Sequence, residues 1–255
     1  MINKLERQYI EKRRLSLLQF IGCIIVAFSL SYIGNIIGVA ITSLIGNFLS
    51  SPIVNPVSEM VGSVDIWTTF LVIVILAPIF EELFFRKFLI DRTIKYGGWA
   101  SVVISATLFA FFHGNLNQFF YTFLLGAFFA YVYVKTGNIK YTIALHGLIN
   151  FSGSIVSMFL ISLLESSIPV DISNLTNAQI MANISDYTPY IAILFISILI
   201  LLVIVLGIIL ILLNYNKINL PVGEVTLKKS SIFLNFGMIC FLIFYIFVII
   251  SSIFV

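Results

Sequence analysis

The chain has 255 residues, of which 60% are hydrophobic and only 10% carry a formal charge, with a net charge of +3. Soluble globular proteins carry about 25% charged residues, so this composition excludes an ordinary soluble domain. Most of the side chains must therefore face lipid or a core within lipid. We expect one membrane domain over residues 1–255, with the lipid bilayer as its surroundings and no nucleic-acid partner.

Seven apolar runs are candidates for membrane spans, and they cover residues 15–49, 67–90, 99–113, 117–134, 141–164, 188–213 and 231–255. A bilayer core of ~30 Å needs about 20 helical residues. The first run is too long for one upright helix and could form two. The third run is short, so we expect that it begins earlier or is shielded by its neighbours. The pattern predicts an all-α fold, a polytopic membrane helix bundle with seven transmembrane helices, or eight if the first run is split.

The placement of basic residues favours one long first helix, because Lys and Arg concentrate in cytoplasmic loops. With seven crossings and a cytoplasmic N-terminus, all 14 basic residues lie on the cytoplasmic side, whereas splitting the first run would put nine of them outside. The segments expected outside contain only acidic charges, at Glu59, Asp65, Glu165, Asp171 and Asp186. We therefore expect a multi-pass protein of the cell membrane with its N-terminus in the cytoplasm.

Outside one segment of the second run, the predicted spans carry almost no formal charge. That segment contains Glu81, Glu82 and Arg86. An ionised residue near the centre of a membrane helix costs about 2.5–3.5 kcal/mol, so such residues usually face an interior cavity and mark function. Glu82 and Arg86 are four residues apart and share one helix face, which predicts an internal ion pair. Glu81 is rotated from Glu82 by about 100° and is free to point elsewhere.

The chain has two histidines, His113 and His146, and both lie near the ends of predicted spans. His146 and Asn150 are four residues apart, so their side chains project from one helix face. A hydrolytic site needs a base that takes a proton from water and donors that hold charge on the attacked carbonyl oxygen. A single intramembrane histidine or ion pair is more often structural. The glutamate pair together with both histidines favours a functional site.

These residues form three spaced motifs, which are Glu81-Glu82-x-x-x-Arg86, Phe109-x-x-x-His113 and His146-x-x-x-Asn150. The series resembles the signature of the CAAX prenyl endopeptidase type II and bacteriocin-processing membrane proteins, the CPBP or Abi family. The resemblance covers roughly residues 75–155. It implies an intramembrane glutamic protease whose catalytic core is that stretch.

The resemblance also implies a role for each polar residue. Glu81 would be the general base, and His113 would help to bind and orient the water. His146 and Asn150 would form the oxyanion hole. Glu82 and Arg86 would be a supporting pair. No cofactor is implied. The substrate would be a membrane-associated or lipophilic peptide or protein: prenylated CAAX peptides in eukaryotes, and in bacteria peptide maturation or bacteriocin self-immunity.

Three other interpretations stay open. Glutamate and histidine can bind zinc, but the chain has no His-Glu-x-x-His helix, so we expect no metal site. A non-catalytic membrane scaffold that regulates a partner such as a sensor kinase would retain the motifs for folding. A transporter could use Glu81 and the histidines as a proton relay, although no pair of broken helices in two repeated halves supports it.

Overall fold

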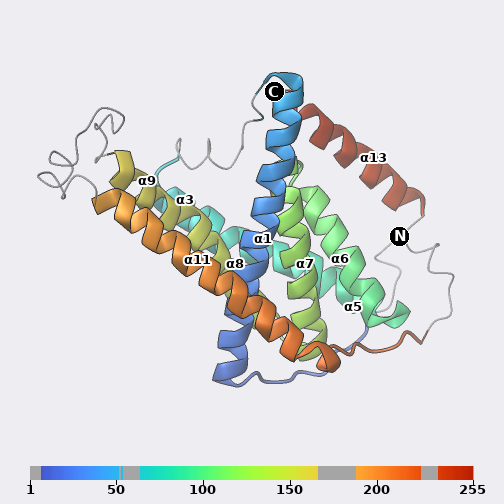
Figure 1. The fold of residues 1–255 in the computed structure, drawn as a ribbon. Coiled ribbons are helices and arrows are strands. Elements are labelled where there is room, and N and C mark those ends of the chain that lie inside the picture. The colour runs from blue at the N-terminus through green and yellow to red at the C-terminus, as the bar shows by residue number, and fades with distance from the viewer. Residues whose placement is uncertain (1–6, 52, 54–63, 166–187, 225–234, 255) are drawn as a thin grey trace, which may run out of the picture.

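The computed structural model describes residues 7–51, 53, 64–165, 188–224 and 235–254 (Figure 1). Within these ranges every regular element is helical, which confirms the predicted all-α class. The elements are α1 (Leu17–Leu49), α3 (Ile66–Thr69), η2 (Phe70–Leu76), α4 (Ala77–Glu82), η3 (Leu83–Phe88), α5 (Leu89–Thr93), η4 (Ile94–Tyr96), α6 (Gly98–Phe112), α7 (Leu116–Thr136), α8 (Ile139–Phe151), η5 (Ser152–Val156), α9 (Ser157–Glu165), α11 (Thr188–Leu213), η8 (Tyr215–Lys217) and α13 (Phe236–Ser251).

Five helical stretches of the described residues are long and apolar enough to cross a membrane, and they are Leu17–Leu49, Ile66–Tyr96, Leu116–Thr136, Ile139–Ser162 and Ile191–Leu213. Two shorter apolar helices, α6 and α13, fall below that length. The chain is therefore a multi-pass membrane protein, and the count of seven crossings stays a prediction. The first apolar run forms one continuous helix, as the charge placement predicted. The short α6 is shielded by packing along α7.

The long helix α1 is the centre of the bundle, with α7 packed along one side and α11 crossing another (Figure 1). Small residues allow the close approach: Gly34 and Gly38 face the backbone of Tyr121 and Asn117 on α7. The hydroxyl of Thr42 lies 2.9 Å from the Asn117 side-chain oxygen in the same interface. Without a hydrophobic driving force between helices in lipid, such close packing and interhelical hydrogen bonds hold the helices together.

Adding a methyl group at Gly34 is expected to destabilise the bundle, because a Cβ atom there would overlap the Cα atom of Tyr121. Overpacking of this kind costs about 1–3 kcal/mol. Gly22 lies in the same helix, and a Cβ atom there would meet nothing within 4 Å. We therefore expect Gly34→Ala to lower the unfolding free energy in mixed micelles and Gly22→Ala to leave it unchanged or slightly raised. Equal unfolding curves for the two variants would contradict the close α1–α7 contact.

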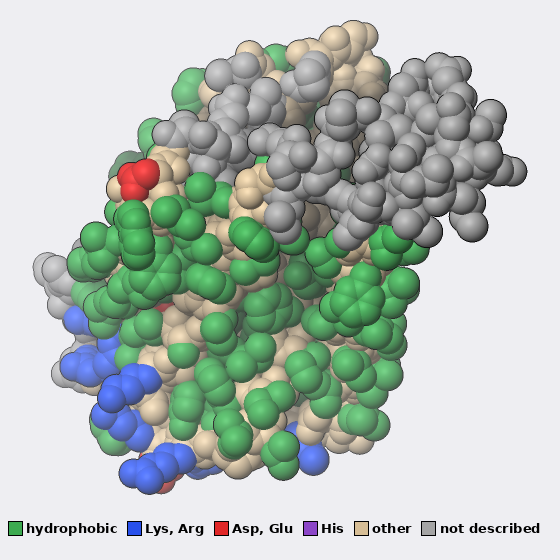
Figure 2. Space-filling model, turned by 90° about the vertical axis from the view of Figure 1, so that its left-hand side faces the viewer, with side chains coloured by type: hydrophobic (Ala, Val, Ile, Leu, Met, Phe, Trp, Pro, Cys, Tyr) green, Lys and Arg blue, Asp and Glu red, His purple; other side chains and the backbone are tan. Residues whose placement is uncertain are grey.

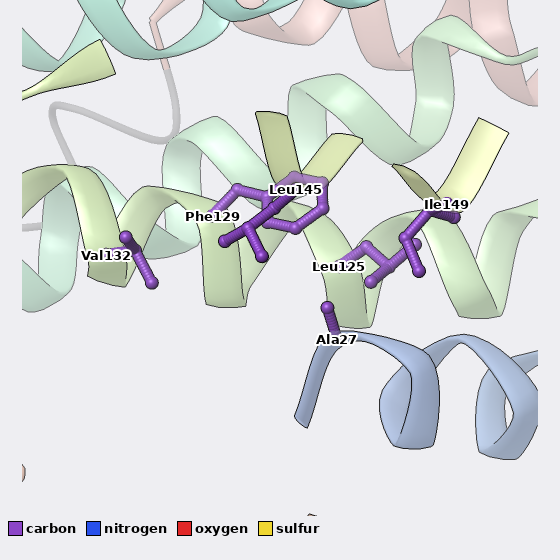
Figure 3. Close-up of a cluster of buried hydrophobic side chains, with 6 residues drawn as sticks. All are labelled: Ala27, Leu125, Phe129, Val132, Leu145 and Ile149. Atoms are coloured by element: carbon purple, nitrogen blue, oxygen red, sulfur yellow. The ribbon is translucent and has the colours of Figure 1, made fainter. Parts of the chain in front are cut away.

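A cluster of buried hydrophobic side chains joins α1, α7 and α8 (Figure 3). Its buried members are Ala27, Leu125, Phe129, Val132, Leu145 and Ile149. Phe129 is fully buried, and its ring centroid lies 5.6 Å from that of His146. The cluster thus fixes the position of α8 relative to α7, and with it the position of the His146 ring.

Lys and Arg side chains gather at one end of the molecule, whereas the sides of the bundle are covered by hydrophobic side chains (Figure 2). At the basic end the buried carboxylate of Asp91 lies 2.9 Å from Arg7 Nε and 2.8 Å from Lys87 Nζ. It also accepts a hydrogen bond of 2.6 Å from the Tyr133 hydroxyl. This network ties the N-terminal segment to α5 and α7.

Candidate active site

The helix that carries the glutamates departs from α-helical geometry on both sides of them, at the π-helical turns η2 and η3. In η2 the N–H of Ala77 donates to the carbonyl of Val72, five residues earlier. In the same pattern Pro78 would have to donate to Ile73, but proline has no N–H. The free carbonyl of Ile73 instead accepts a 2.9 Å hydrogen bond from the Asn150 side-chain amide. Such π-turns are frequent at functional sites.

A glycine lets α8 approach this irregular turn closely. A Cβ atom at Gly147 would lie 3.2 Å from the carbonyl oxygen of Val74, which is tighter than ordinary van der Waals contact. His146 precedes Gly147 in the chain and faces α4. The bond between Asn150 and Ile73 lies one turn further along the same helix. Together these contacts place His146 and Asn150 beside the glutamate pair.

Glu82 is fully buried and held at both carboxylate oxygens. Arg86 Nε lies 3.1 Å from its Oε2 atom, which confirms the ion pair predicted from their spacing. His146 Nδ1 lies 2.9 Å from its Oε1 atom. Because a carboxylate paired with a guanidinium only accepts, the Nδ1–H group of His146 must be the donor in this bond. The second ring nitrogen, Nε2, is then turned towards Glu81.

Glu81 has a different environment from its neighbour. Its side chain is 20% exposed, whereas that of Glu82 is 0% exposed. The Oε2 atom of Glu81 lies 3.7 Å from His146 Nε2 and has no hydrogen-bond partner among the described residues. Catalytic hydrogen bonds are often this long before substrate binds. Of the two adjacent carboxylates, therefore, Glu81 is the one whose side chain is exposed in part.

One aromatic ring separates the charged groups from the second histidine. Phe109 is 2% exposed, and its ring centroid lies 4.8 Å from that of His113 and 5.7 Å from that of His146. The Arg86 guanidinium carbon lies 4.4 Å from the same ring centroid, within the range of a cation–π interaction. Phe109 therefore packs against both imidazoles and covers a cation that is 0% exposed.

His113 caps the C-terminal end of α6 and is oriented by the backbone. Its Nδ1 atom lies 2.9 Å from the Phe109 carbonyl oxygen, which can only accept, so Nδ1 carries the hydrogen. In the neutral ring Nε2 is then a hydrogen-bond acceptor. Within the described ranges His113 makes no hydrogen bond or ion pair with Glu81. His146, rather than His113, is thus the histidine in direct contact with both glutamates.

The sequence reasoning missed three residues that shape this site: Ile73, Gly147 and Phe129. Pro78, three residues before Glu81, was a usable signal for the first, because a proline in the interior of a helix leaves a carbonyl group without its N–H donor. Gly147 next to His146 was a weaker signal of a close helix contact. Nothing singled out Phe129, since the run 117–134 is rich in aromatic residues.

The glutamate and histidine side chains that could have bound zinc make contacts with other protein groups. Among the described residues, no group of three or more His, Cys, Asp and Glu side chains is arranged to hold a metal ion. Arg86 occupies one oxygen of Glu82 and His146 occupies the other. A cation entering between these groups would also meet the positive charge of the buried guanidinium.

Residues 63–152 match the family model of the Rce1-like proteins, the type II CAAX prenyl endopeptidases. This finding confirms the resemblance that the three motifs predicted, and the matched stretch contains all six candidate residues from Glu81 to Asn150. No curated protein and no solved structure matches the chain.

Proposed function

We propose that the chain is an intramembrane glutamate-dependent endopeptidase. The match of residues 63–152 to the Rce1-like type II CAAX prenyl endopeptidases is the premise of this proposal. The observation that carries this proposal is the unequal pair of glutamates. Glu82 is locked between Arg86 and His146, whereas Glu81 is partly exposed and faces the imidazole. A general base has to be free of a permanent ion pair, and among the described residues Glu81 makes no salt bridge with an arginine or a lysine.

The proposed reaction begins with a water molecule that Glu81 deprotonates as its oxygen attacks the peptide carbonyl. His113 presents Nε2 as an acceptor, which orients the second hydrogen of that water. Negative charge then develops on the carbonyl oxygen. His146 and Asn150 are the proposed donors to this oxyanion, since they project from the same face of α8 beside the base.

Asn150 suits the role of a preorganised donor. Its amide has two N–H groups, and one of them donates to Ile73 over 2.9 Å. That bond holds the orientation of the carboxamide while leaving the second N–H group for the substrate. A donor that is already aligned needs no reorganisation when the charge forms, which is why it stabilises the transition state so strongly.

Replacing Asn150 with alanine is expected to lower the rate of hydrolysis by about 10²–10³-fold, the usual effect of losing one oxyanion donor. The assay uses the purified protein in liposomes with an isoprenylated CAAX peptide, and mass spectrometry measures the released fragment. Ser154→Ala is the matched control, because the Ser154 hydroxyl donates to the Asn150 backbone carbonyl on the same helix. We expect that control to keep most of its activity; equal losses in both variants would contradict the donor role.

Exhaustive chelation is expected to leave the activity unchanged, because both oxygens of Glu82 and one nitrogen of His146 already bind protein groups. The measurement compares initial rates before and after incubation with a zinc chelator and dialysis. A loss of activity that added zinc restores would overturn the metal-free mechanism.

The substrate is proposed to be a membrane-associated or lipophilic peptide or protein, because the glutamates and His146 lie on two of the stretches that are long and apolar enough to cross a membrane. The basic end of the bundle is proposed to face the cytoplasm together with the N-terminus (Figure 2). In a bacterial cell the reaction would serve peptide maturation or bacteriocin self-immunity.

A further inference from the structure

A cavity of about 370 Å³ lies at the basic end of the bundle. Its volume is within the ~300–1,000 Å³ that is typical of small-molecule pockets. None of the six candidate site residues lines it, so it is separate from the proposed active site. Its walls come from four stretches of the chain, which are residues 8–13, 94–95, 134–135 and 219–224.

Backbone contacts hold these walls together. The Arg13 N–H group donates to the Thr136 carbonyl oxygen over 2.8 Å, and the Glu224 N–H group donates to that of Lys95 over 2.9 Å. Gly137 lets the N-terminal segment come this close to the end of α7, because a Cβ atom there would lie 2.6 Å from two carbonyl oxygens of that segment. The cavity is therefore part of the fold, bounded by stretches that are far apart in the sequence.

The cavity lies at the level where the apolar part of the bundle ends. Its wall at residues 94–95 belongs to the last turn of the stretch Ile66–Tyr96. Its wall at 134–135 belongs to the last turn of Leu116–Thr136, and its N-terminal wall directly precedes α1. The polar headgroups of a bilayer begin where its hydrocarbon core ends. A phospholipid headgroup is consequently within reach of this cavity.

The charged side chains around the cavity leave an excess of one positive charge. Arg13 and Glu11 cancel each other as an ion pair of 3.1 Å. The other charged residues of the lining are Lys95, Lys135 and Glu224. Neither lysine forms a salt bridge within the described part of the chain. A single phosphodiester group, which carries one negative charge, would balance this excess.

Aromatic rings lie next to the two ammonium groups without neutralising them. Lys95 Nζ lies 5.5 Å from the ring centroid of Tyr96, and Lys135 Nζ lies 6.0 Å from that of Tyr131. These distances are within the range of a cation–π interaction. Because such contacts restrict the two side chains, the lysines lose less conformational entropy when they bind an anion.

Uncharged side chains next to the lysines suit the remainder of a lipid. Val222 is 91% exposed and Tyr9 is 80% exposed, and both line the cavity. Tyrosine is enriched at membrane interfaces because its ring has an apolar body and a polar tip. Gln8 and Asn219 add side-chain amides, which are donors suited to phosphate oxygens. An apolar surface beside a cationic cavity favours an amphiphile over a small soluble phosphate compound.

We propose that this cavity binds the headgroup of an anionic phospholipid such as phosphatidylglycerol. The ammonium groups of Lys95 and Lys135 contact the phosphate, and Glu224 disfavours a second negative charge. Val222 and Tyr9 lie against the glycerol and the acyl chains. Basic pockets between transmembrane helices bind acidic lipid headgroups in the same way. The inference concerns a second site and does not depend on the proposed peptidase function.

A lipid titration tests the two lysines. The purified full-length protein in micelles of a neutral detergent is mixed with phosphatidylglycerol or phosphatidylcholine, and native mass spectrometry measures the fraction that carries one lipid. We expect Lys95→Gln/Lys135→Gln to weaken phosphatidylglycerol binding by about tenfold or more, because two attractive charges are lost. Lys140→Gln/Lys217→Gln is the matched control, since both of these lysines are exposed and neither lines the cavity. Equal affinities of the two double variants would overturn the proposal.

Glu224→Gln is expected to act in the opposite direction and to tighten phosphatidylglycerol binding by about fivefold, because it removes a repulsive charge from the lining. A folding defect does not produce tighter binding, so this variant tests the site independently of stability. Unchanged or weaker binding would overturn the proposed position of the phosphate.

A competitor distinguishes a lipid from a soluble ligand. Glycerophosphoglycerol is the headgroup of phosphatidylglycerol without its acyl chains, and we expect it to displace the lipid only at far higher concentrations. Displacement at concentrations comparable to those of the lipid would assign the cavity to a soluble phosphate compound and overturn the lipid site. Equal binding of phosphatidylcholine and phosphatidylglycerol by the unaltered protein would overturn the preference for an anionic headgroup.

Discussion

Glu81→Gln is expected to lower peptide hydrolysis by about 10²–10⁴-fold, the range that a general base contributes. Glutamine has the same shape as glutamate and preserves the packing around the side chain, but it cannot accept a proton from water. The comparison is made on kcat/KM for an isoprenylated peptide with purified protein in liposomes. The loss should lie in kcat, because the base acts only in the transition state.

Glu11→Gln is the matched control for this substitution. Glu11 pairs with Arg13 over 3.1 Å, and both side chains are largely exposed, so the pair contributes little to stability. Hydrolysis by Glu81→Gln at the rate of the unaltered protein would contradict the role of Glu81 as the general base. If Glu81→Gln abolished hydrolysis but still complemented a deletion strain, the cellular role would be that of a scaffold. A comparison of membrane peptides from cells with the two proteins would identify the substrate.

Arg86→Met should destabilise the fold by about 3–5 kcal/mol, the cost of breaking a buried ion pair by removing one partner. The substitution keeps an unbranched apolar side chain against Phe109, whose ring centroid lies 4.4 Å from the guanidinium carbon. The carboxylate of Glu82 would then remain buried without its cation. Reversible unfolding in mixed micelles measures the loss.

A double-mutant cycle separates the ion pair from simple packing. In Glu82→Gln/Arg86→Met both charges are absent, so we expect the double variant to be more stable than Arg86→Met alone. Arg14→Met removes an exposed arginine and is the control for the substitution itself. If Arg86→Met were no less stable than Arg14→Met, the Glu82–Arg86 contact would contribute nothing to the fold.

Features that depend on local geometry could be predicted from the amino-acid sequence. The hydrophobic runs located the helices to within a few residues, as with 15–49 against Leu17–Leu49 and 188–213 against Thr188–Leu213. The four-residue spacing of Glu82 and Arg86 predicted their ion pair, because helical periodicity alone brings such residues together. The number of crossings and the chemical roles of the site residues stay predictions.

The contacts between polar groups on different helices could not be predicted from the sequence, because they depend on how the helices pack. The contact of His146 with Glu82 joins residues 64 positions apart, and that of Asn150 with Ile73 joins residues 77 apart. Both lie next to π-turns and a close glycine contact, which are features that helical periodicity does not encode. For the same reason the pairing of the glutamates with His146 rather than His113 followed from packing, since spacing along the chain favoured neither histidine.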